Sequence, residues 1–317
     1  MKLDFENIQS DYGRWLKAYL RHLKYKDAST NTLEVYTRIL HKLSGFIDTQ
    51  TQVHSLEELN KAFFLDFIEY AAEHSRKGHF SKKTKQLYVS ILKSFFTYIS
   101  DNNDVFYTFE NEFKITLKST NKTKKVRYLT DTEVDSIIKY LDDMCYTRGT
   151  YYDYIYSLGI KCMLYGGLRI SEVLKLKLSD FTLSDLLNNE GERDIYELHL
   201  GETKSGEEQT ALIKTEDIAE ELAYFRKLYN RNDYIFQSSI KKTLIHRSNF
   251  YVSVKTIMQK LGLDKKGLHI YRHTCAMQLY RKSKDILVTK EKLRHADIKT
   301  TMIYAYAEQS DVAEAMR

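Results

Sequence analysis

The chain has 317 residues, of which 43% are hydrophobic and 29% charged, so it can bury a sizeable core and is too apolar to be disordered throughout. At about 100–200 residues per domain, its length predicts two domains or one large one. The apolar runs are shorter than the roughly 18 residues of a membrane helix, and residues 1–6 are too acidic for a signal peptide, so we expect a cytoplasmic protein. Three cysteines without paired spacing argue against a disulfide framework and a structural zinc site.

The net charge is uneven along the chain. Residues 1–127 contain 21 Lys and Arg against 15 Asp and Glu, a net charge of +6, whereas residues 128–317 contain 28 of each. A basic part joined to a neutral part suits nucleic-acid binding by the first and chemistry or regulation by the second. Ordinary surface charge would give the same totals, so charge alone does not decide between these interpretations.

Four amphipathic helices are predicted in residues 1–116. Apolar residues recur at helical spacing in the segments 8–23, 33–47, 59–71 and 88–99. Ser55 and Glu58 form a capping box that we expect to open the third helix. Because four such helices can bury one shared core, this part is predicted to be an all-α helical bundle.

Basic residues gather before and within the start of the fourth helix, and no acidic residue lies between Arg76 and Lys93. A cluster of one sign at a helix start suits contact with phosphates, although it would also serve as a solvated face. Residues 117–127 are basic and poor in large apolar groups, so we expect a domain linker that can also follow a nucleic-acid backbone. The candidate binding residues are Arg76, Lys77, Lys82, Lys83, Lys85, Lys122, Lys124 and Lys125.

Residues 128–317 mix helices with a small sheet. Thr130 and Glu133 form a second capping box, and residues 151–174 are predicted to be two helical stretches around a glycine pair. Alternating apolar residues at 194–200 and 209–213 predict a β-hairpin, after which helices continue from about residue 216 to the end. The order of helices, antiparallel sheet and helices is typical of an α+β domain.

Several cationic or proton-transferring residues stand at marked positions. Arg169 follows the glycine pair, which lets a backbone or ligand come close, and Lys204 lies at the hairpin tip. His269 and Arg272 are three apart at a predicted helix start and so share a face. His295 precedes Tyr304 by nine residues, about two and a half turns if helical. Each of these residues, taken alone, has an ordinary structural explanation.

Together and in order, these residues resemble the tyrosine recombinases, or phage integrase family, and most of all the Xer-type bacterial site-specific recombinases. The resemblance covers residues from about 128 to the end, and residues 1–116 look like the family's core-binding (SAM-like) domain. Its motifs are Tyr165-Gly-Gly-Leu-Arg-Ile-Ser-Glu172, Gly201-Glu-Thr-Lys-Ser-Gly206, His269-Ile-Tyr-Arg-His-Thr274 and Leu293-Arg-His-Ala-Asp-Ile-Lys-Thr-Thr-Met-Ile-Tyr304.

The resemblance implies a two-domain, C-shaped clamp around duplex DNA that exchanges strands through a 3′-phosphotyrosyl link and a Holliday junction. It assigns the following roles: Tyr304 as nucleophile, Arg169 and Arg272 as ligands of the phosphate oxygens, Lys204 as general acid, His269 as general base, His295 as a further phosphate ligand and Glu172 as a support that orients the cluster.

Elementary chemistry agrees with these roles. Two guanidinium groups can neutralise the charge that builds on an attacked phosphodiester. Tyrosine, with a pKa near 10, is a poor nucleophile at neutral pH unless a base and cations stand nearby. Such a site needs no metal or other cofactor, and the sequence shows no carboxylate cluster that would hold a metal.

Four features depart from the family pattern or extend it. Arg294 stands where the family usually has glycine, which adds a phosphate contact or crowds the site, and the prolines near the hairpin and the His-x-x-Arg motif are missing. Tyr306 is a distant second candidate for the nucleophile. Residues 311–316 can form a short apolar-faced helix, which we expect to dock on a neighbouring subunit rather than to fray.

The resemblance also implies the partners. We expect a homo-tetramer on two DNA sites, a monomer or dimer off DNA, an accessory DNA translocase or bending protein, no membrane contact, and a cytoplasmic location on the nucleoid. The biological role is chromosome dimer resolution or integration and excision of a mobile element, and the compact layout favours the former. The alternatives are a type IB topoisomerase-like enzyme that relaxes DNA, and a DNA-binding protein that does not cleave.

Overall fold

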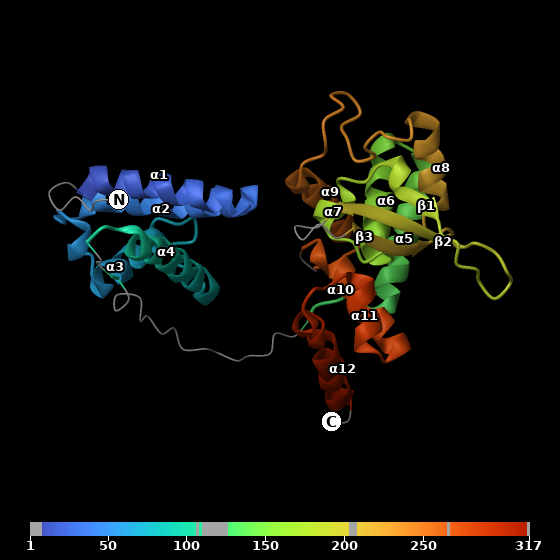
Figure 1. Ribbon diagram of the computed structural model, residues 1–317. Helices are drawn as coiled ribbons and strands as arrows, with labels where there is room; N and C mark the ends of the chain where they lie inside the picture. Colours follow the sequence, from blue (N-terminus) through green and yellow to red (C-terminus); the bar gives the residue numbers. More distant parts are fainter. Residues whose placement is uncertain (1–7, 106–107, 110–125, 203–207, 265–266, 316–317) are drawn as a thin grey trace. The chain divides into compact units, whose positions relative to one another are not determined.

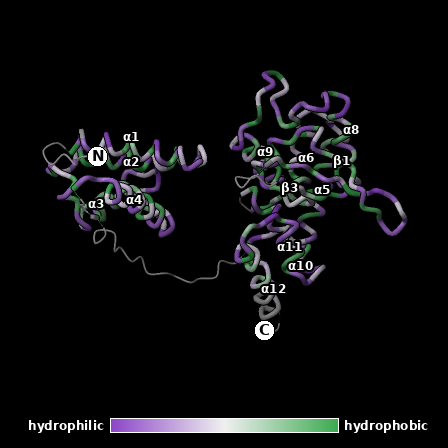
Figure 2. The backbone as a smooth tube through the Cα atoms, in the orientation of Figure 1, coloured by the Kyte–Doolittle hydropathy of each residue, from purple (hydrophilic) through white to green (hydrophobic). Residues whose placement is uncertain are grey.

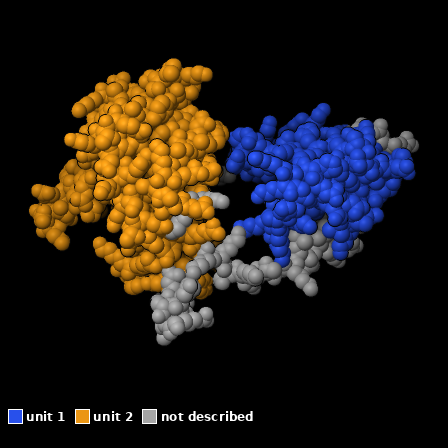
Figure 3. All heavy atoms as spheres, turned by 180° about the vertical axis from the view of Figure 1, so that it is seen from behind, with its two compact units in different colours: residues 1–122 blue, residues 123–317 orange. Residues whose placement is uncertain are grey.

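The computed structural model describes residues 8–105, 108–109, 126–202, 208–264 and 267–315. The chain divides into two compact units, Met1–Lys122 and Thr123–Arg317 (Figure 3), and each unit has its own hydrophobic core. The chain is mostly helical with one small antiparallel sheet (Figure 1), which confirms the predicted fold class. Within the described ranges, no helix is long and apolar enough to span a bilayer.

The first unit is a four-helix domain. Its helices are α1 (Ile8–Tyr25), α2 (Thr30–Gln50), α3 (Lys61–Glu73) and α4 (Lys82–Asn102) (Figure 1). Side-chain oxygens of Ser29, Asn60 and Ser81 accept hydrogen bonds from backbone N–H groups in the first turns of α2, α3 and α4. Each of these helices therefore begins at a short polar side chain, as capping preferences require.

The third helix begins later than the sequence predicts. Ser55 and Glu58 form a capping box, but it heads the short 3₁₀ helix η1 (Leu56–Glu58). Asn60 caps α3 instead, and its Oδ1 accepts from the N–H of Phe63 at 3.0 Å. The prediction was wrong in this detail because two polar cap signals stand close together and apolar periodicity does not separate them.

Aromatic side chains fill the core of the first unit. Trp15, Phe64, Phe95 and Phe96 are almost fully buried and meet their neighbours mostly edge to face. The hydroxyl of the buried Tyr12 donates to the carbonyl oxygen of Leu40 at 2.7 Å, so this polar atom is satisfied inside the core. Hydrophobic and hydrophilic residues alternate along the helices (Figure 2), as expected when each helix buries one face.

The second unit surrounds a small sheet with helices. Its helices are α5 (Asp131–Thr147), α6 (Tyr151–Leu164), α7 (Ile170–Val173), α8 (Ala219–Leu228), α9 (Arg247–Lys260), α10 (His269–Ser283), α11 (Ile286–Leu293) and α12 (Met302–Ala315), with the 3₁₀ helices η2 (Leu178–Asp180) and η3 (Ile298–Thr300). The predicted capping box of Thr130 and Glu133 heads α5, with hydrogen bonds in both directions.

The sheet has three antiparallel strands in the order β1-β2-β3. They are β1 (Phe181–Leu183), β2 (Ile195–Glu202) and β3 (Glu208–Lys214). The predicted hairpin corresponds to β2 and β3, with Tyr196 opposite Ile213, whereas β1 was not predicted. Three residues are too few for alternation to reveal a strand.

A buried ion pair ties three helices of the second unit together. Nζ of Lys161 on α6 lies 2.7 Å from Glu221 Oε1 on α8 and 2.8 Å from Asp142 Oδ1 on α5. The side chains of Lys161 and Glu221 are only 9% and 2% exposed. Burial alone would lower the pKa of Lys161, but the charge of Glu221 and the hydrogen bonds of both carboxylates raise it, so the ammonium stays charged.

Breaking this pair tests its contribution to stability. Replacing Lys161→Met leaves the Glu221 carboxylate buried without its cation, so we expect the free energy of unfolding to fall by about 3–5 kcal/mol. Urea denaturation of the full chain measures this change.

The matched control is Arg193→Met, which breaks an exposed pair with Asp185 whose side chains are 50% and 90% exposed. It should cost less than about 1 kcal/mol. Equal losses in the two variants would contradict a special role for the buried pair.

Candidate active site

The site is built around the turn that joins α6 to α7. Gly167 has a φ of +63°, and a Cβ on it would lie 3.2 Å from Leu293 Cδ2 and 3.3 Å from Cys275 Sγ. The glycine pair therefore lets helices α10 and α11 approach the turn. The carbonyl oxygen of Gly167 then faces two arginines, Arg272 at 2.5 Å and Arg294 at 3.4 Å.

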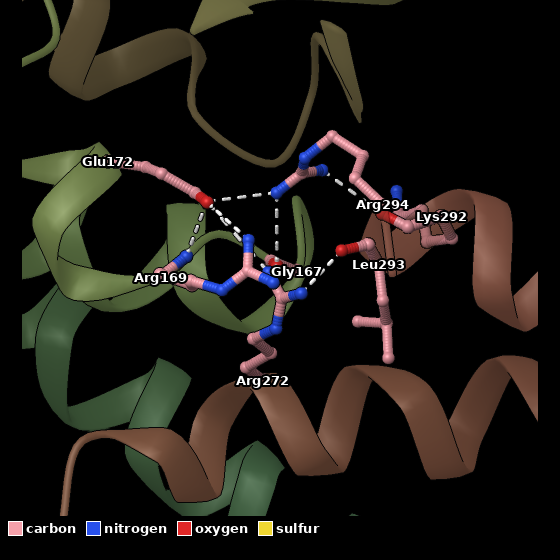
Figure 4. Close-up of polar contacts among 7 residues, drawn as sticks. All are labelled: Gly167, Arg169, Glu172, Arg272, Lys292, Leu293 and Arg294. Atoms are coloured by element: carbon pink, nitrogen blue, oxygen red, sulfur yellow. Dashed lines mark hydrogen bonds and ion pairs between the residues drawn. The ribbon is translucent and has the colours of Figure 1, made fainter. Parts of the chain in front are cut away.

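Glu172 lies at the centre of the arginine cluster (Figure 4). Its Oε1 pairs with Arg169 Nη1 at 2.7 Å, and its Oε2 accepts from the Arg169 backbone N–H at 2.7 Å. Oε2 also lies 3.0 Å from Arg294 Nη2 and 3.8 Å from Arg272 Nη1. Burial would raise the pKa of Glu172, but the Arg169 backbone bond and the Arg294 charge outweigh it, so the pKa is lowered and the carboxylate stays ionised.

Arg272 comes from the first turn of α10 and is nearly buried, with 6% of its side chain exposed. Its two terminal nitrogens donate to the backbone carbonyls of Gly167 and Leu293. Burial, and next the charge of Arg169, lowers the pKa of Arg272 to about 10, so the group is still cationic at neutral pH. Arg169 is more open, with 37% of its side chain exposed. The predicted pair of arginines thus shares one carboxylate.

Arg294 joins the same cluster from the end of α11. Its side chain is only 6% exposed, and its guanidinium contacts Glu172, the Gly167 carbonyl and the Lys292 carbonyl. The guanidinium is turned inward onto Glu172, so Arg294 adds a third cation to the cluster, and the expected phosphate contact stays a prediction.

The hydroxyl of Tyr304 meets a histidine to which the sequence assigned no role. Tyr304, on α12, is 1% exposed, and its Oη shares a 2.8 Å hydrogen bond with Nδ1 of His273 on α10. Burial raises the pKa of Tyr304 to about 12, although Arg272 and Arg169 counteract it. Tyr306, the second candidate, is 54% exposed. His273 follows directly after Arg272 in the quoted motif. Its place next to a predicted phosphate ligand was the one signal in the sequence that could have marked it as a site residue.

The two histidines of the predicted set, His269 and His295, have lowered pKa values. His269 stands partly exposed at the start of α10, and its ring lies 6.5 Å from the ring of His273. Burial and the charges of Arg247, Arg272 and Arg169 lower its pKa. His295 hydrogen-bonds Thr301 through Nδ1 at 2.9 Å, and burial followed by the charge of Arg272 lowers its pKa to about 4.

The segment from His295 to Tyr304 is not one helix. Arg294 ends α11 in the left-handed region with φ 53°, η3 follows, and α12 begins at Met302. The helical spacing considered for these residues was therefore wrong, although both side chains belong to the same unit. The predicted short helix at 311–316 is the end of α12, which runs on to Ala315.

Some of the remaining predicted residues lie in or near α4, and the others lie outside the described residues. Lys82, Lys83 and Lys85 lie in the first turn of α4, and Arg76 and Lys77 are exposed in the segment before it. Lys204, Lys122, Lys124 and Lys125 lie outside the described residues. No group of three or more His, Cys, Asp or Glu side chains in the described ranges is placed to hold a metal ion.

Comparison with known proteins identifies the class. Residues 127–310 match the phage integrase family, and residues 5–101 match the phage integrase SAM-like domain. The chain belongs to the phage integrase family, the tyrosine recombinases, and is Xer-like.

Individual relatives agree with this assignment. Tyrosine recombinase XerH of Helicobacter pylori is 27% identical over 278 residues, which cover 83% of this chain and 71% of XerH. Transposase A from transposon Tn554 of Staphylococcus aureus is 26% identical, and the match covers 94% of this chain and 89% of the transposase. The fold matches a crystal structure of XerH bound to difH substrate in a pre-cleavage complex, with a TM-score of 0.76, 22% identity, and coverage of 100% of this chain and 98% of that one.

The lowered pKa of His295 gives a pH prediction. In the unfolded chain the ring titrates near about 6.5, whereas in the folded chain it stays neutral until about pH 4. Since the unfolded state then binds more protons, the stability contributed by neutral His295 is complete above pH 6.5 and is lost as the pH falls towards 4. Imidazole proton signals in NMR spectra of the full chain measure the midpoint.

The signal is assigned with His295→Gln, which should also weaken the dependence of the unfolding free energy on pH between about 4 and 6.5. A folded-state midpoint at or above 6.5 would contradict the arrangement around His295.

Proposed function

We propose that this tyrosine recombinase cuts and rejoins duplex DNA at a specific site through a covalent link to Tyr304. The observation that carries the proposal is that one unit holds a buried tyrosine hydroxyl, bonded to His273, and an arginine cluster centred on Glu172, whose Arg272 and Arg169 act to lower the pKa of that tyrosine. A phosphodiester is an anion, and guanidinium groups stabilise the charge that develops on its oxygens during attack. The quoted motifs and the family assignment support the same reaction.

The steps follow from the residues in hand. Arg169 and Arg272 bind the non-bridging oxygens of the scissile phosphate, with His295 beside them. Tyr304 Oη loses its proton and forms a bond to phosphorus, while the bond from phosphorus to the 5′-oxygen breaks. Lys204, assigned by its motif position, gives its proton to that oxygen. The 5′-hydroxyl of a second strand can reverse the step without an added energy source, because the phosphotyrosyl link retains the bond energy.

The acceptor of the tyrosine's proton is a choice between two histidines. The motif position assigns this role to His269, but the hydrogen bond to Tyr304 Oη belongs to His273. Burial, with the charges of His269 and Arg272, lowers the pKa of His273, so its ring is neutral and its Nδ1 can accept. We assign the proton to His273, with His269 shaping the electrostatic field beside it.

The first turn of α4 supports a DNA-binding role for the helical unit. It carries Lys82, Lys83 and Lys85 and no acidic residue. Cations at a helix N-terminus are opposed by the helix dipole, so this placement costs stability unless an anion lies nearby. A DNA phosphate is such an anion. We propose on this ground that the helical unit contacts the phosphates of duplex DNA.

Assembly and biological role are proposed at the level the relatives support. Strand exchange joins two DNA sites, so we propose a homo-tetramer on DNA, with the end of α12 and the residues beyond it docking between subunits and an accessory translocase or bending protein controlling exchange. Action on a chromosome would place the protein on the nucleoid in the cytoplasm. The names of the relatives include both Xer recombinases and a transposase, so either dimer resolution or mobile-element movement is compatible with the family.

Covalent capture tests the reaction. The protein is incubated with fragmented DNA from its source, denatured with detergent, and the attached DNA is sequenced, with Tyr304→Phe and Tyr306→Phe as matched variants. We expect adducts at one site that are lost only in Tyr304→Phe, because this change removes the attacking oxygen and leaves the ring in place.

Each other outcome points to a defined alternative. Adducts scattered over many sequences would favour a topoisomerase-like enzyme, and loss of adducts in Tyr306→Phe alone would move the nucleophile. Binding without any adduct would favour a DNA-binding protein that does not cleave. Adducts at a single chromosomal locus would support dimer resolution, whereas adducts at the ends of an inserted element would support integration.

The proton acceptor is tested by the pH dependence of cleavage. Without the base, hydroxide must remove the proton of Tyr304. His273→Gln should therefore slow adduct formation by about 10²–10⁴-fold at neutral pH, and the rate should increase steeply with pH. His269→Gln is the matched variant and should keep most of the parental rate at neutral pH, with a much smaller change in the pH profile. The reverse result would return the role of base to His269.

A further inference from the structure

Arg294 occupies a backbone position that disfavours its side chain. It follows α11, and its φ of 53° lies in the left-handed region, where Cβ of an L-residue is crowded by the backbone and glycine is favoured. Its N–H bonds the Glu291 carbonyl at 2.9 Å, so the conformation belongs to the end of the helix. A strained residue of this kind persists where its side chain has a specific use.

Both terminal nitrogens of Arg294 have hydrogen-bond partners. Nη2 pairs with Glu172 Oε2 at 3.0 Å and approaches the Gly167 carbonyl at 3.4 Å, while Nη1 donates to the Lys292 carbonyl at 3.0 Å (Figure 4). Nε is buried and has no hydrogen-bond partner among the described residues. Arg294 thus joins the residue that orients the cluster, Glu172, to the turn and to the end of α11.

A third arginine changes the charge that the cluster offers to an anion. Arg169 and Arg272 with Glu172 have a net charge of +1, and Arg294 raises it to +2. The cationic crowding is felt within the cluster, because burial and neighbouring arginines lower the pKa of both Arg272 and Arg294. An anion brought to this cluster would relieve that repulsion.

We propose that Arg294 is a positioning residue for phosphate binding. It neutralises Glu172 and fixes it against the Gly167 turn, so that Arg169 and Arg272 meet the scissile phosphate with their full charge. Arg294 pairs with Glu172 at 3.0 Å, whereas Arg272 lies 3.8 Å from it and Arg169 is 37% exposed, so we assign Arg294 to Glu172 and the phosphate contacts to Arg169 and Arg272. This inference rests on the proposed function and deepens it.

The test compares two forms of one substrate. A nicked synthetic duplex carrying the captured site is made with a normal scissile phosphate and with a methylphosphonate, which has no negative charge at phosphorus. Rates of strand cleavage are measured for the full chain, Arg294→Gln, Arg294→Lys and the control Lys299→Gln. Lys299 is exposed on η3 and lies near Arg294 in sequence, so its replacement removes a charge without touching Glu172.

We expect Arg294→Gln to cleave the normal phosphate at least about tenfold more slowly and the methylphosphonate at nearly the parental rate. Arg294→Lys keeps a positive charge next to Glu172 but lacks the two-pronged guanidinium. Its rate on the normal phosphate should therefore lie between the rates of Arg294→Gln and the parent chain. Lys299→Gln should match the parent on both substrates.

Two results would overturn the proposal. An equal defect on both substrates would mean that Arg294 supports the fold of the site in general, and thermal unfolding of each variant would show the same loss. No defect on either substrate would mean that the side chain is dispensable.

A second measurement does not depend on cleavage. Inorganic phosphate is titrated into the full chain and followed by the imidazole signals of His295, whose pKa responds to the arginines beside it. Arg294→Gln should raise the dissociation constant about tenfold, and Lys299→Gln should leave it unchanged. An unchanged dissociation constant in Arg294→Gln, or no phosphate binding by the parent chain, would refute the inference. If the parent chain cleaved neither substrate, the proposed function would be refuted instead.

Discussion

The carboxylate of Glu172 is the interaction on which the rest of the site depends. It accepts from the backbone and side chain of Arg169, pairs with Arg294 from the end of α11, and faces Arg272 from α10 at 3.8 Å. Three guanidinium groups at such distances would repel one another in a half-buried site. One ionised carboxylate offsets part of that repulsion and fixes the directions of the groups, leaving a net positive charge for an anion.

The cationic surroundings also decide which groups can move protons. Burial and nearby arginines keep His269, His273 and His295 neutral, so a ring nitrogen is available as an acceptor. Burial raises the pKa of Tyr304 to about 12, so its hydroxyl stays protonated until a base acts on it. In this buried position the hydroxyl shares a 2.8 Å hydrogen bond with Nδ1 of His273. A phosphate bound beside Tyr304 would lie next to a nucleophile whose proton His273 can accept.

The sequence predicted most of the fold, because its signals are local and repeated. Apolar periodicity predicted the four helices of the first unit and the hairpin of β2 and β3. The strand β1 was missed because three residues carry no period, and α3 was started too early because two cap signals adjoin. Motifs also placed Arg169, Glu172 and Arg272 in one cluster, but the partner of Tyr304 depends on how α10 and α12 pack. Spacing cannot reveal that contact, nor can it show that Arg294 turns inward.

An experimental structure of the full chain with orthovanadate would show whether Tyr304 and the arginines act on the same phosphate. Vanadate adopts the five-coordinate geometry of an attacked phosphate, so it reports at once where the anion binds and which oxygen attacks. The account predicts vanadate bonded to Tyr304 Oη at an apical position, with Arg169 and Arg272 on its equatorial oxygens and Arg294 still paired with Glu172. Vanadate bound elsewhere, or bound at the arginines with Tyr304 turned away from it, would contradict the account.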